Sequence, residues 1–409
     1  MKAGERKKDL IRKQVQHLSF DFDRYIERRG TNSLKYDFAE ERGLPKDVLP
    51  LWVADMDFQS PPAVTKALIS AAEHGIFGYS EVKDSYYEAL TAWFRKRFEV
   101  ELEPRAFVKT PGVVFAIAQA IRAFSEEGDG VVIQPPVYYP FFEVIRDNHR
   151  RLLENPLVLK DGHYEIDFED LERKLSEKDV KIFLFCSPHN PVGRVWTEEE
   201  LRKIGSLCEK YDVILISDEI HCDLVRPGYH HTPVVKACPD HTERIIMMTA
   251  PSKTFNTPGL QNSNIYIPHR PLRQRFRAEL ASTGYSQQNL MSLVASEAAY
   301  REGEEWLIQV LDYLEHNYRI LREYVEEHLP KARLIEAEGT YFAWIDFSGY
   351  GLSDEELNHK IIYEAGLWLD AGTVFGREAG SGFERLVYAT PEAVLKEALE
   401  RLGRTFEDH

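Results

Sequence analysis

The chain has 409 residues, which exceeds the usual size of one compact domain and predicts a large domain together with a smaller one. Its formal net charge of -16 repels a phosphate backbone, so we expect no nucleic-acid partner. No apolar run approaches the ~20 residues that span a bilayer, so we expect no membrane-embedded segment.

The cysteines and the N-terminus both favour a cytoplasmic protein. Four cysteines lie in apolar or periodic segments without a CxxC pair: Cys186, Cys208, Cys222 and Cys238. We therefore expect buried thiols instead of disulfides or a structural zinc site. Residues 1–20 are basic but contain no apolar core or cleavage site, so we predict a solvated arm and a short helix instead of a targeting signal.

The first strong pattern along the chain is a strand, a helix and a second strand. Residues 107–112 form an extended segment that breaks at Gly112, and helical spacing follows over residues 113–124. The segment 128–136, GDGVVIQPP, is again typical of a strand.

Further strands continue this alternation. A buried strand over 180–186 ends in a turn, and Thr197 and Glu200 then stand at capping-box spacing at the start of a helix. The segments 213–220 and 244–253 are typical of short strands. Because strands and helices alternate, we predict an α/β fold whose mostly parallel sheet lies between helices.

The pattern changes near residue 300. The segment 304–329 has the period of a long, charged amphipathic helix, and the sequence then predicts strands around 341–347 and a helix near Ser353. We predict a large domain over residues 60–295. A smaller, discontinuous α+β domain would contain residues 1–59 and 296–409.

Groups with useful chemistry fall at the ends of these strands, where parallel sheets bind ligands. Asn190 and Lys253 follow strands, Asp218 closes one, and Gly112 opens a helix. Taken singly, each has a plainer explanation. Asn190 could be a turn residue, Asp218 a capping residue, and Lys253 a solvated surface lysine.

Together these groups supply an amine for an imine bond, a carboxylate for a ring nitrogen, an amide for a phenolic oxygen and N–H groups for a phosphate. Pyridoxal 5'-phosphate (PLP) requires such a set. The chain also contains, in order, the motifs LPLWVADMDF, HGIFGYS, TPGVV, QPPVYYPF, SPHNPVGRVWT, SDEIHCDL and APSKTF. From about Phe22 to Leu402 it resembles the cystathionine β-lyase and cystalysin-like subgroup of class I/II aminotransferase-fold PLP enzymes.

The resemblance implies roles for residues that match these motifs. Lys253 would bind PLP covalently and also move the α-proton of the substrate. Asp218 would pair with the protonated pyridine nitrogen, and Asn190 would donate to the phenolic oxygen. His221 stands where aminotransferases of this fold usually have a tyrosine, and it would also contact the cofactor.

Three tyrosines receive roles by the same resemblance. Tyr138 would stack on the cofactor ring, and Tyr139 would reach toward the imine or the substrate amine. Tyr79 would be lent to the phosphate of a neighbouring subunit, which implies a homodimer with a shared active site. The alternative is that all three tyrosines are ordinary buried aromatics.

The phosphate would bind where a helix begins. The backbone N–H groups of Gly112, Val113 and Val114 would face it, with the hydroxyl of Ser252 beside them. Gly112 could instead be an ordinary turn glycine. Gln261 lies where many aminotransferases of this fold have a phosphate-binding arginine, which favours the lyase branch.

Arg385 resembles the arginine that binds the α-carboxylate of the substrate as a bidentate pair. A surface ion pair with a nearby glutamate is the alternative. Val387 and Glu392 depart from the family pattern, which more often has asparagine and arginine at these positions. Both departures put the carboxylate contact in doubt.

The resemblance implies a carbon-sulfur β-lyase that acts on cystathionine or a related S-substituted L-cysteine. An aminotransferase is the nearest rival, because the two reactions share the removal of the α-proton. Some members of the subgroup bind a transcription factor, so a regulatory role is a further alternative. The His and Cys residues near position 221 match no zinc pattern, so we expect no metal.

Overall fold

The computed structural model describes residues 19–407, so the arm and helix predicted for residues 1–20 lie almost wholly outside the described residues. The chain divides into two compact units. The larger unit contains residues 60–303 and 338–340, and the smaller one contains the remaining described residues. The larger unit extends to residue 303 because α11 (Leu290–Glu302) packs on α2 (Pro62–His74) and α3 (Asp84–Phe98).

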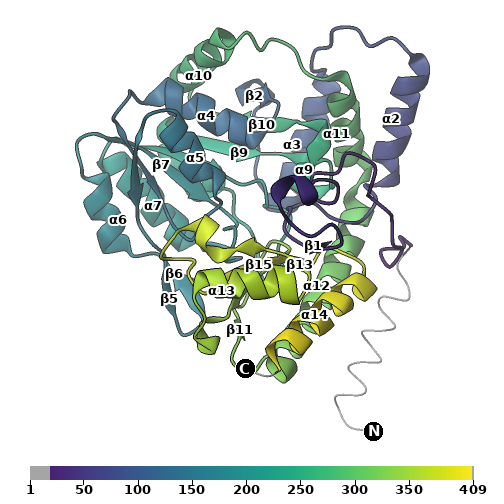
Figure 1. Cartoon of the computed structure of the whole chain (residues 1–409). Helices are drawn as coiled ribbons and strands as arrows, with labels where there is room; N and C mark the ends of the chain where they lie inside the picture. Colours follow the sequence, from purple (N-terminus) through teal and green to yellow (C-terminus); the bar gives the residue numbers. More distant parts are fainter. Residues whose placement is uncertain (1–18, 408–409) are drawn as a thin grey trace. The chain divides into compact units, whose positions relative to one another are not determined.

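The larger unit is built on a seven-stranded sheet (Figure 1). Its strands are, in spatial order, β2 (Phe107–Thr110), β10 (Ser263–Tyr266), β9 (Ile245–Thr249), β8 (Ile214–Asp218), β7 (Val180–Cys186), β3 (Gly130–Ile133) and β4 (Arg151–Glu154). Neighbouring strands from β9 to β4 are parallel, whereas β10 is antiparallel to both β9 and β2. Hence β2 runs in the same direction as the parallel strands, and β10 is the reversed strand that the sequence pattern did not predict.

Helices cover both faces of this sheet. On one face, apolar side chains of the strands form a buried cluster with α4 (Val113–Phe124), α5 (Pro140–Asp147) and α10 (Arg270–Ser282). Successive strand residues point to opposite faces, so Phe183 and Leu215, which lie outside that cluster, face the other side. Here α6 (Phe168–Leu175) and α7 (Glu198–Lys210) contact β7 and β8. The predicted α/β class is confirmed.

Local sequence signals begin two of the helices. The backbone N–H of Glu200 donates to Oγ1 of Thr197, and Oε2 of Glu200 accepts from the backbone N–H of Thr197, which is the predicted capping box of α7. Ser353 and Glu356 form the same arrangement before α13 (Asp354–His359). The larger unit is completed by short elements: β5 (Val158–Lys160), β6 (His163–Glu165), α8 (Val234–Ala237) and α9 (Pro251–Thr254).

The smaller unit is formed by both ends of the described chain. Its antiparallel sheet has the order β11 (Arg333–Leu334), β12 (Phe342–Asp346), β15 (Phe383–Val387) and β14 (Asp370–Ala371). Its long helices are α12 (Glu304–His328) and α14 (Glu392–Phe406), which pack on each other. A separate parallel pair joins β1 (Leu49–Pro50) to β13 (Leu367–Trp368). Within residues 19–407, no helix combines the length and apolarity needed to cross a bilayer.

Candidate active site

The parallel strands of the larger unit end at one edge of the sheet, and the predicted cofactor residues follow these ends. Gly112 lies after β2, Tyr138 after β3 and Asn190 after β7. Asp218 ends β8, and Lys253 lies in α9 directly after β9. Because these strands run in the same direction, the topology places all five residues at the same edge, where ligands bind in open α/β sheets.

Asp218 is a buried carboxylate, with 3% of its surface exposed. Its Oδ1 accepts a hydrogen bond from the backbone N–H of Ile220 at 3.1 Å. Burial raises the pKa of Asp218 to about 7, against the lowering effects of this N–H and of the positive charge of Lys253. A cation placed against this carboxylate, such as a protonated pyridine nitrogen, would therefore stabilise its charged form.

Asn190 is buried and is held close to the end of β8. Its backbone N–H donates to Sγ of Cys186 at 3.4 Å, and Cys186 is the direct cross-strand partner of Asp218. The backbone N–H of Ser187 donates to the backbone oxygen of Asp218 at 2.9 Å. Burial raises the pKa of the Cys186 thiol, so this side chain stays protonated and serves as a structural contact.

Lys253 is partly buried and lies in the short helix α9. The buried carboxylate of Asp223 holds this helix in position through a hydrogen bond. Oδ2 of Asp223 accepts from Oγ1 of Thr254 at 2.9 Å. The same carboxylate accepts from Nε1 of Trp93 at 3.1 Å and pairs with Nε of Arg97 at 2.6 Å. Asp223 was not among the predicted site residues, although it belongs to the SDEIHCDL motif, which was the available signal.

His221 is buried in a turn after β8. The strand predicted over 213–220 ends at Asp218, because the backbone turns there: the N–H of Cys222 donates to the oxygen of Glu219 at 3.0 Å. Glu219 binds His231 at 2.8 Å. Among residues 19–407, no three His, Cys, Asp or Glu side chains are grouped in a way that could hold a metal ion.

Tyr138 and Tyr139 precede α5 and are both half-buried. Their ring centroids lie 5.4 Å apart and their planes are tilted by 51°. The ring of Tyr138 also meets the edge of Phe141, at a centroid distance of 6.0 Å. The ring of Tyr138 is thus fixed on one side by the core, while part of both tyrosines remains accessible, as a stacking surface requires.

The N-terminus of α4 fits a phosphate group. No side chain caps this helix end, whose first residues are Val113 and Val114. A Cβ atom added to Gly112 would meet no atom within 4 Å, so the space before the helix is open. Ser252 is buried, whereas Gln261 is exposed in a left-handed backbone conformation. First-turn N–H groups and the helix dipole favour an anion here.

Tyr79 lies on the surface of the larger unit, with 93% of its side chain exposed. The alternative of a buried aromatic is therefore wrong for this residue. Ile76 and Phe77 in the same segment are 67% and 63% exposed. An exposed apolar segment of this kind is typical of a surface that another protein chain covers.

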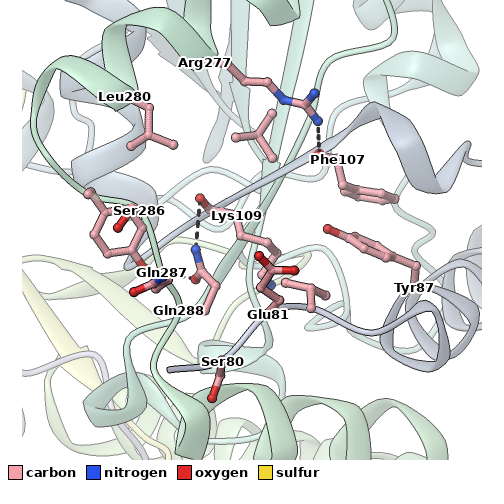
Figure 2. Close-up of a pocket in the computed structure, with 13 residues that line it drawn as sticks. Ser80, Glu81, Tyr87, Phe107, Lys109, Arg277, Leu280, Ser286, Gln287 and Gln288 are labelled. Carbon is pink, nitrogen blue, oxygen red and sulfur yellow. Dashed lines mark hydrogen bonds between the residues drawn. The ribbon is translucent and has the colours of Figure 1, made fainter. Parts of the chain in front are cut away.

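A hollow of about 360 Å³ lies beside this segment (Figure 2). It is lined by residues 80–82, 107–109 and 285–288 together with Tyr87, Arg277 and Leu280. Nζ of Lys109 donates to the hydroxyl of Tyr86 and to Oδ1 of Asn264, each at 2.6 Å, and burial lowers the pKa of Lys109. None of the predicted cofactor residues lines this hollow, so it is distinct from the edge that carries Lys253.

Arg385 lies in the smaller unit and is buried, with 2% of its surface exposed. It forms an ion pair with Asp370, so the alternative of a surface pair with a glutamate is wrong. Val387 is buried in β15. Glu392 begins α14 and pairs with His316 at 2.6 Å and with Lys396, which explains an acidic residue at this position without reference to a ligand.

Comparisons with known proteins agree with this geometry. Residues 46–402 match the family described as aminotransferase class I and II. The chain is 43% identical to the cystathionine beta-lyase PatB of Bacillus subtilis (strain 168), over 93% of this chain and 98% of that protein. Cystalysin from Treponema denticola, a structure that contains PLP, has a TM-score of 0.92 and 38% identity, over 96% of this chain and 100% of that chain. The PLP-bound C-S lyase from Staphylococcus hominis has a TM-score of 0.89 and 34% identity, over 95% and 99%. The chain therefore belongs to the aminotransferase class I and II family and has its PLP-dependent transferase-like fold.

Proposed function

We propose that this protein is a PLP-dependent carbon-sulfur β-lyase. It converts L-cystathionine, or a related S-substituted L-cysteine, and water into pyruvate, ammonia and a thiol such as homocysteine. One observation carries the proposal: the buried carboxylate of Asp218 and the charged amine of Lys253 lie within electrostatic reach at the ends of adjacent strands. The identity of 43% to a cystathionine beta-lyase supports the choice of reaction.

The residues at the strand ends match the parts of the cofactor in chemical type. Asp218 would accept a hydrogen bond from the ring nitrogen, and the side chains of Asn190 and His221 would contact the ring substituents. Tyr138 would lie against the ring. The start of α4 and the hydroxyl of Ser252 would bind the phosphate. When bound, PLP supplies an electron-withdrawing ring that makes the α-proton of an amino acid removable.

The side chains of the protein transfer protons to and from the substrate and hold it in the reactive orientation. The amine of Lys253 takes the proton from the α-carbon of the substrate and returns a proton to the departing sulfur as the carbon-sulfur bond breaks. Tyr139 orients the substrate amine through its hydroxyl. Arg385 binds the α-carboxylate. Asp223 keeps Lys253 in place by holding Thr254 in the same short helix.

Incubation of the purified protein with L-cystathionine and without a 2-oxo acid tests the reaction. We expect continuous release of pyruvate and homocysteine in equal amounts over many turnovers, because a β-lyase regenerates its cofactor in each cycle. An aminotransferase would stop after one turnover and accumulate pyridoxamine phosphate. Parallel assays with an added 2-oxo acid provide the control, and a strict requirement for that acid would contradict the proposal.

We further propose a homodimer in which Tyr79 serves the phosphate site of the partner subunit. Its exposure, together with that of Ile76 and Phe77, supports this arrangement. All four cysteines are buried and unpaired, which supports a location in the reducing cytoplasm.

Mixing two inactive variants tests the shared site. Tyr79→Ala and Lys253→Ala are each expected to be poorly active or inactive, but a hybrid dimer has one site with both native residues. After unfolding and refolding of an equal mixture, we expect about one quarter of wild-type activity, because about half of the dimers are hybrids with one complete site. If Tyr79 acted within its own subunit, the mixture would show only the average of the two separate variants.

A further inference from the structure

The strand pair β14–β15 places a carboxylate directly against the guanidinium of Arg385. Asp370 and Arg385 are direct cross-strand partners, so their side chains leave the sheet on the same face. Nη2 of Arg385 donates to Oδ2 of Asp370, and the two side chains are 2% and 11% exposed. Water therefore screens this pair only weakly.

The same nitrogen has a second acceptor in the protein. Nη2 of Arg385 also donates to the backbone oxygen of Trp52 at 2.7 Å. A guanidinium Nη carries two N–H groups, so both are engaged by the protein itself. A bidentate contact with an external carboxylate through Nη1 and Nη2 thus requires one of these acceptors to give way. A backbone oxygen in an ordered segment is the harder of the two to displace.

Aromatic rings keep the guanidinium where it is. The Cζ atom of Arg385 lies 4.4 Å from the ring centroid of Phe342 and 4.8 Å from that of Phe375. Contacts of this kind fix the plane of the guanidinium and favour its charge. Rotation of the Arg385 side chain away from Asp370 is therefore hindered. A substrate carboxylate that approaches Arg385 encounters an ion pair whose net charge is already zero.

We propose that Asp370 is a specificity-determining residue that competes with the α-carboxylate of the substrate for Arg385. Asp370 thereby lowers the affinity of the enzyme for every amino acid with a free α-carboxylate. The choice between substrates then depends on the part of the substrate beyond its β-carbon. The inference rests on the proposed function, because it takes the substrate to be an α-amino acid bound by Arg385. It goes beyond that function by assigning a role to the residue opposite the arginine.

Protonation of Asp370 would weaken its ion pair with Arg385 and free the guanidinium for the substrate. Burial raises the pKa of Asp370, against the lowering effect of Arg385. The other titratable groups near this position are Glu384, whose pKa is raised well above its ordinary value by burial and by Asp370, and Asp354. Binding of a second carboxylate would favour the neutral acid at Asp370, so substrate binding should take up protons and KM should rise with pH.

A series of variants at Asp370 tests the proposal. Asp370→Asn keeps the shape and leaves a weaker, neutral acceptor, whereas Asp370→Ala removes the competitor. At pH 8 we expect KM for L-cystathionine to fall roughly tenfold in the Asn variant and further in the Ala variant, because a charge–charge repulsion is removed. The value of kcat should change less than about twofold, because the contact is the same before and during reaction.

Binding of L-alanine, which has no leaving group at its β-carbon, gives a readout without carbon-sulfur cleavage. Isothermal titration calorimetry of the PLP-loaded enzyme in two buffers of different ionisation enthalpy should show proton uptake in the wild type and none in Asp370→Asn. The dissociation constant should fall in the same order as KM. Asp346→Asn is the matched control, because it removes a carboxylate of the same sheet that pairs with another arginine, Arg333, at 3.4 Å, and it should leave these values unchanged.

An unchanged or higher KM in both variants would overturn the proposal. Asp370 would then be a residue that orients Arg385 for substrate binding. Equal proton uptake in the wild type and in Asp370→Asn would do the same. A wild-type enzyme that neither binds L-alanine nor cleaves any S-substituted cysteine would overturn the proposed function as well. Thermal unfolding of each variant, compared with the wild type, separates these effects from a loss of the fold.

Discussion

Lys253→Ala is expected to abolish carbon-sulfur cleavage, with a loss of more than about 10³-fold in kcat/KM, because the variant lacks both the covalent anchor and the proton-transferring amine. The purified variant should also lose the yellow colour of the bound imine. Reduction of the wild type with borohydride should fix the cofactor on the peptide that contains Lys253, and mass spectrometry of that peptide checks the position.

Lys109 provides the matched control for this experiment. It is a buried amine in the larger unit, and burial lowers its pKa, so it is the rival nucleophile for an aldehyde. Its Nζ is held by Tyr86 and Asn264, away from the strand ends. Lys109→Met should keep the reducible adduct on Lys253. An adduct on Lys109, or undiminished lyase activity in Lys253→Ala, would contradict the assignment.

Asp218→Asn is expected to lower kcat/KM by more than about 10³-fold, because the neutral amide cannot stabilise a protonated ring nitrogen. The same change should stabilise the cofactor-free protein at high pH. The pKa of Asp218 is about 7 in the folded protein and 3.8 without the influence of the fold, so the folded state binds this proton more tightly. The free energy of unfolding therefore falls as pH rises from about 4 to 7, by up to about 4 kcal/mol.

Denaturant unfolding of the cofactor-free proteins at pH 4 and pH 8 measures this difference. We expect equal stability near pH 4 and a more stable Asp218→Asn variant at pH 8. Added PLP should stabilise the wild type more than the variant at pH 8, because its ring nitrogen supplies the missing cation. A variant that is less stable than the wild type at both pH values would show that Asp218 has another buried cationic partner.

The strand-end residues could be predicted because their signals are local. A run of apolar, β-branched residues followed by a polar one indicates a strand and its end, and Asp218 and Lys253 stand at such ends. The helix over 113–124 and the capping box at Thr197 are local in the same sense. The parallel topology then places these residues, which are far apart in the sequence, at the same edge of the sheet.

The pairing of Asp370 with Arg385 could not be predicted, because it depends on the register of two strands. That register is set by the connection between them, in which Gly372 and Gly380 approach so closely that a Cβ on Gly372 would lie 2.1 Å from the backbone oxygen of Gly380. No periodic pattern encodes such a contact. Tyr79 is a different case: its sequence signal allowed both a tyrosine that serves a neighbouring subunit and a buried aromatic, and the exposure of the residue in the folded chain excludes the second alternative.

The return of the chain to the larger unit at residues 338–340 is equally non-local. Glu338 accepts from Nε of Arg194 at 3.0 Å and from the backbone N–H of Val195 at 2.7 Å. Arg194 is itself buried, and it pairs both with Glu200, six positions further along the chain, and with Glu338, which follows it by 144 positions. The sequence predicts neither this partner nor the unit boundary that it creates, because both arise from long-range packing.

The pairing of β1 with β13 constrains how the polypeptide can fold as it leaves the ribosome. Leu49 emerges early, but its partner Leu367 is synthesised about 320 residues later, which takes on the order of half a minute at 5–20 residues per second. Until then Trp52, which is buried in the finished unit, lacks the ring of Trp368, on which it stacks at a centroid distance of 4.3 Å. The larger unit can form during this interval, whereas the smaller one is closed last by the C-terminal segment.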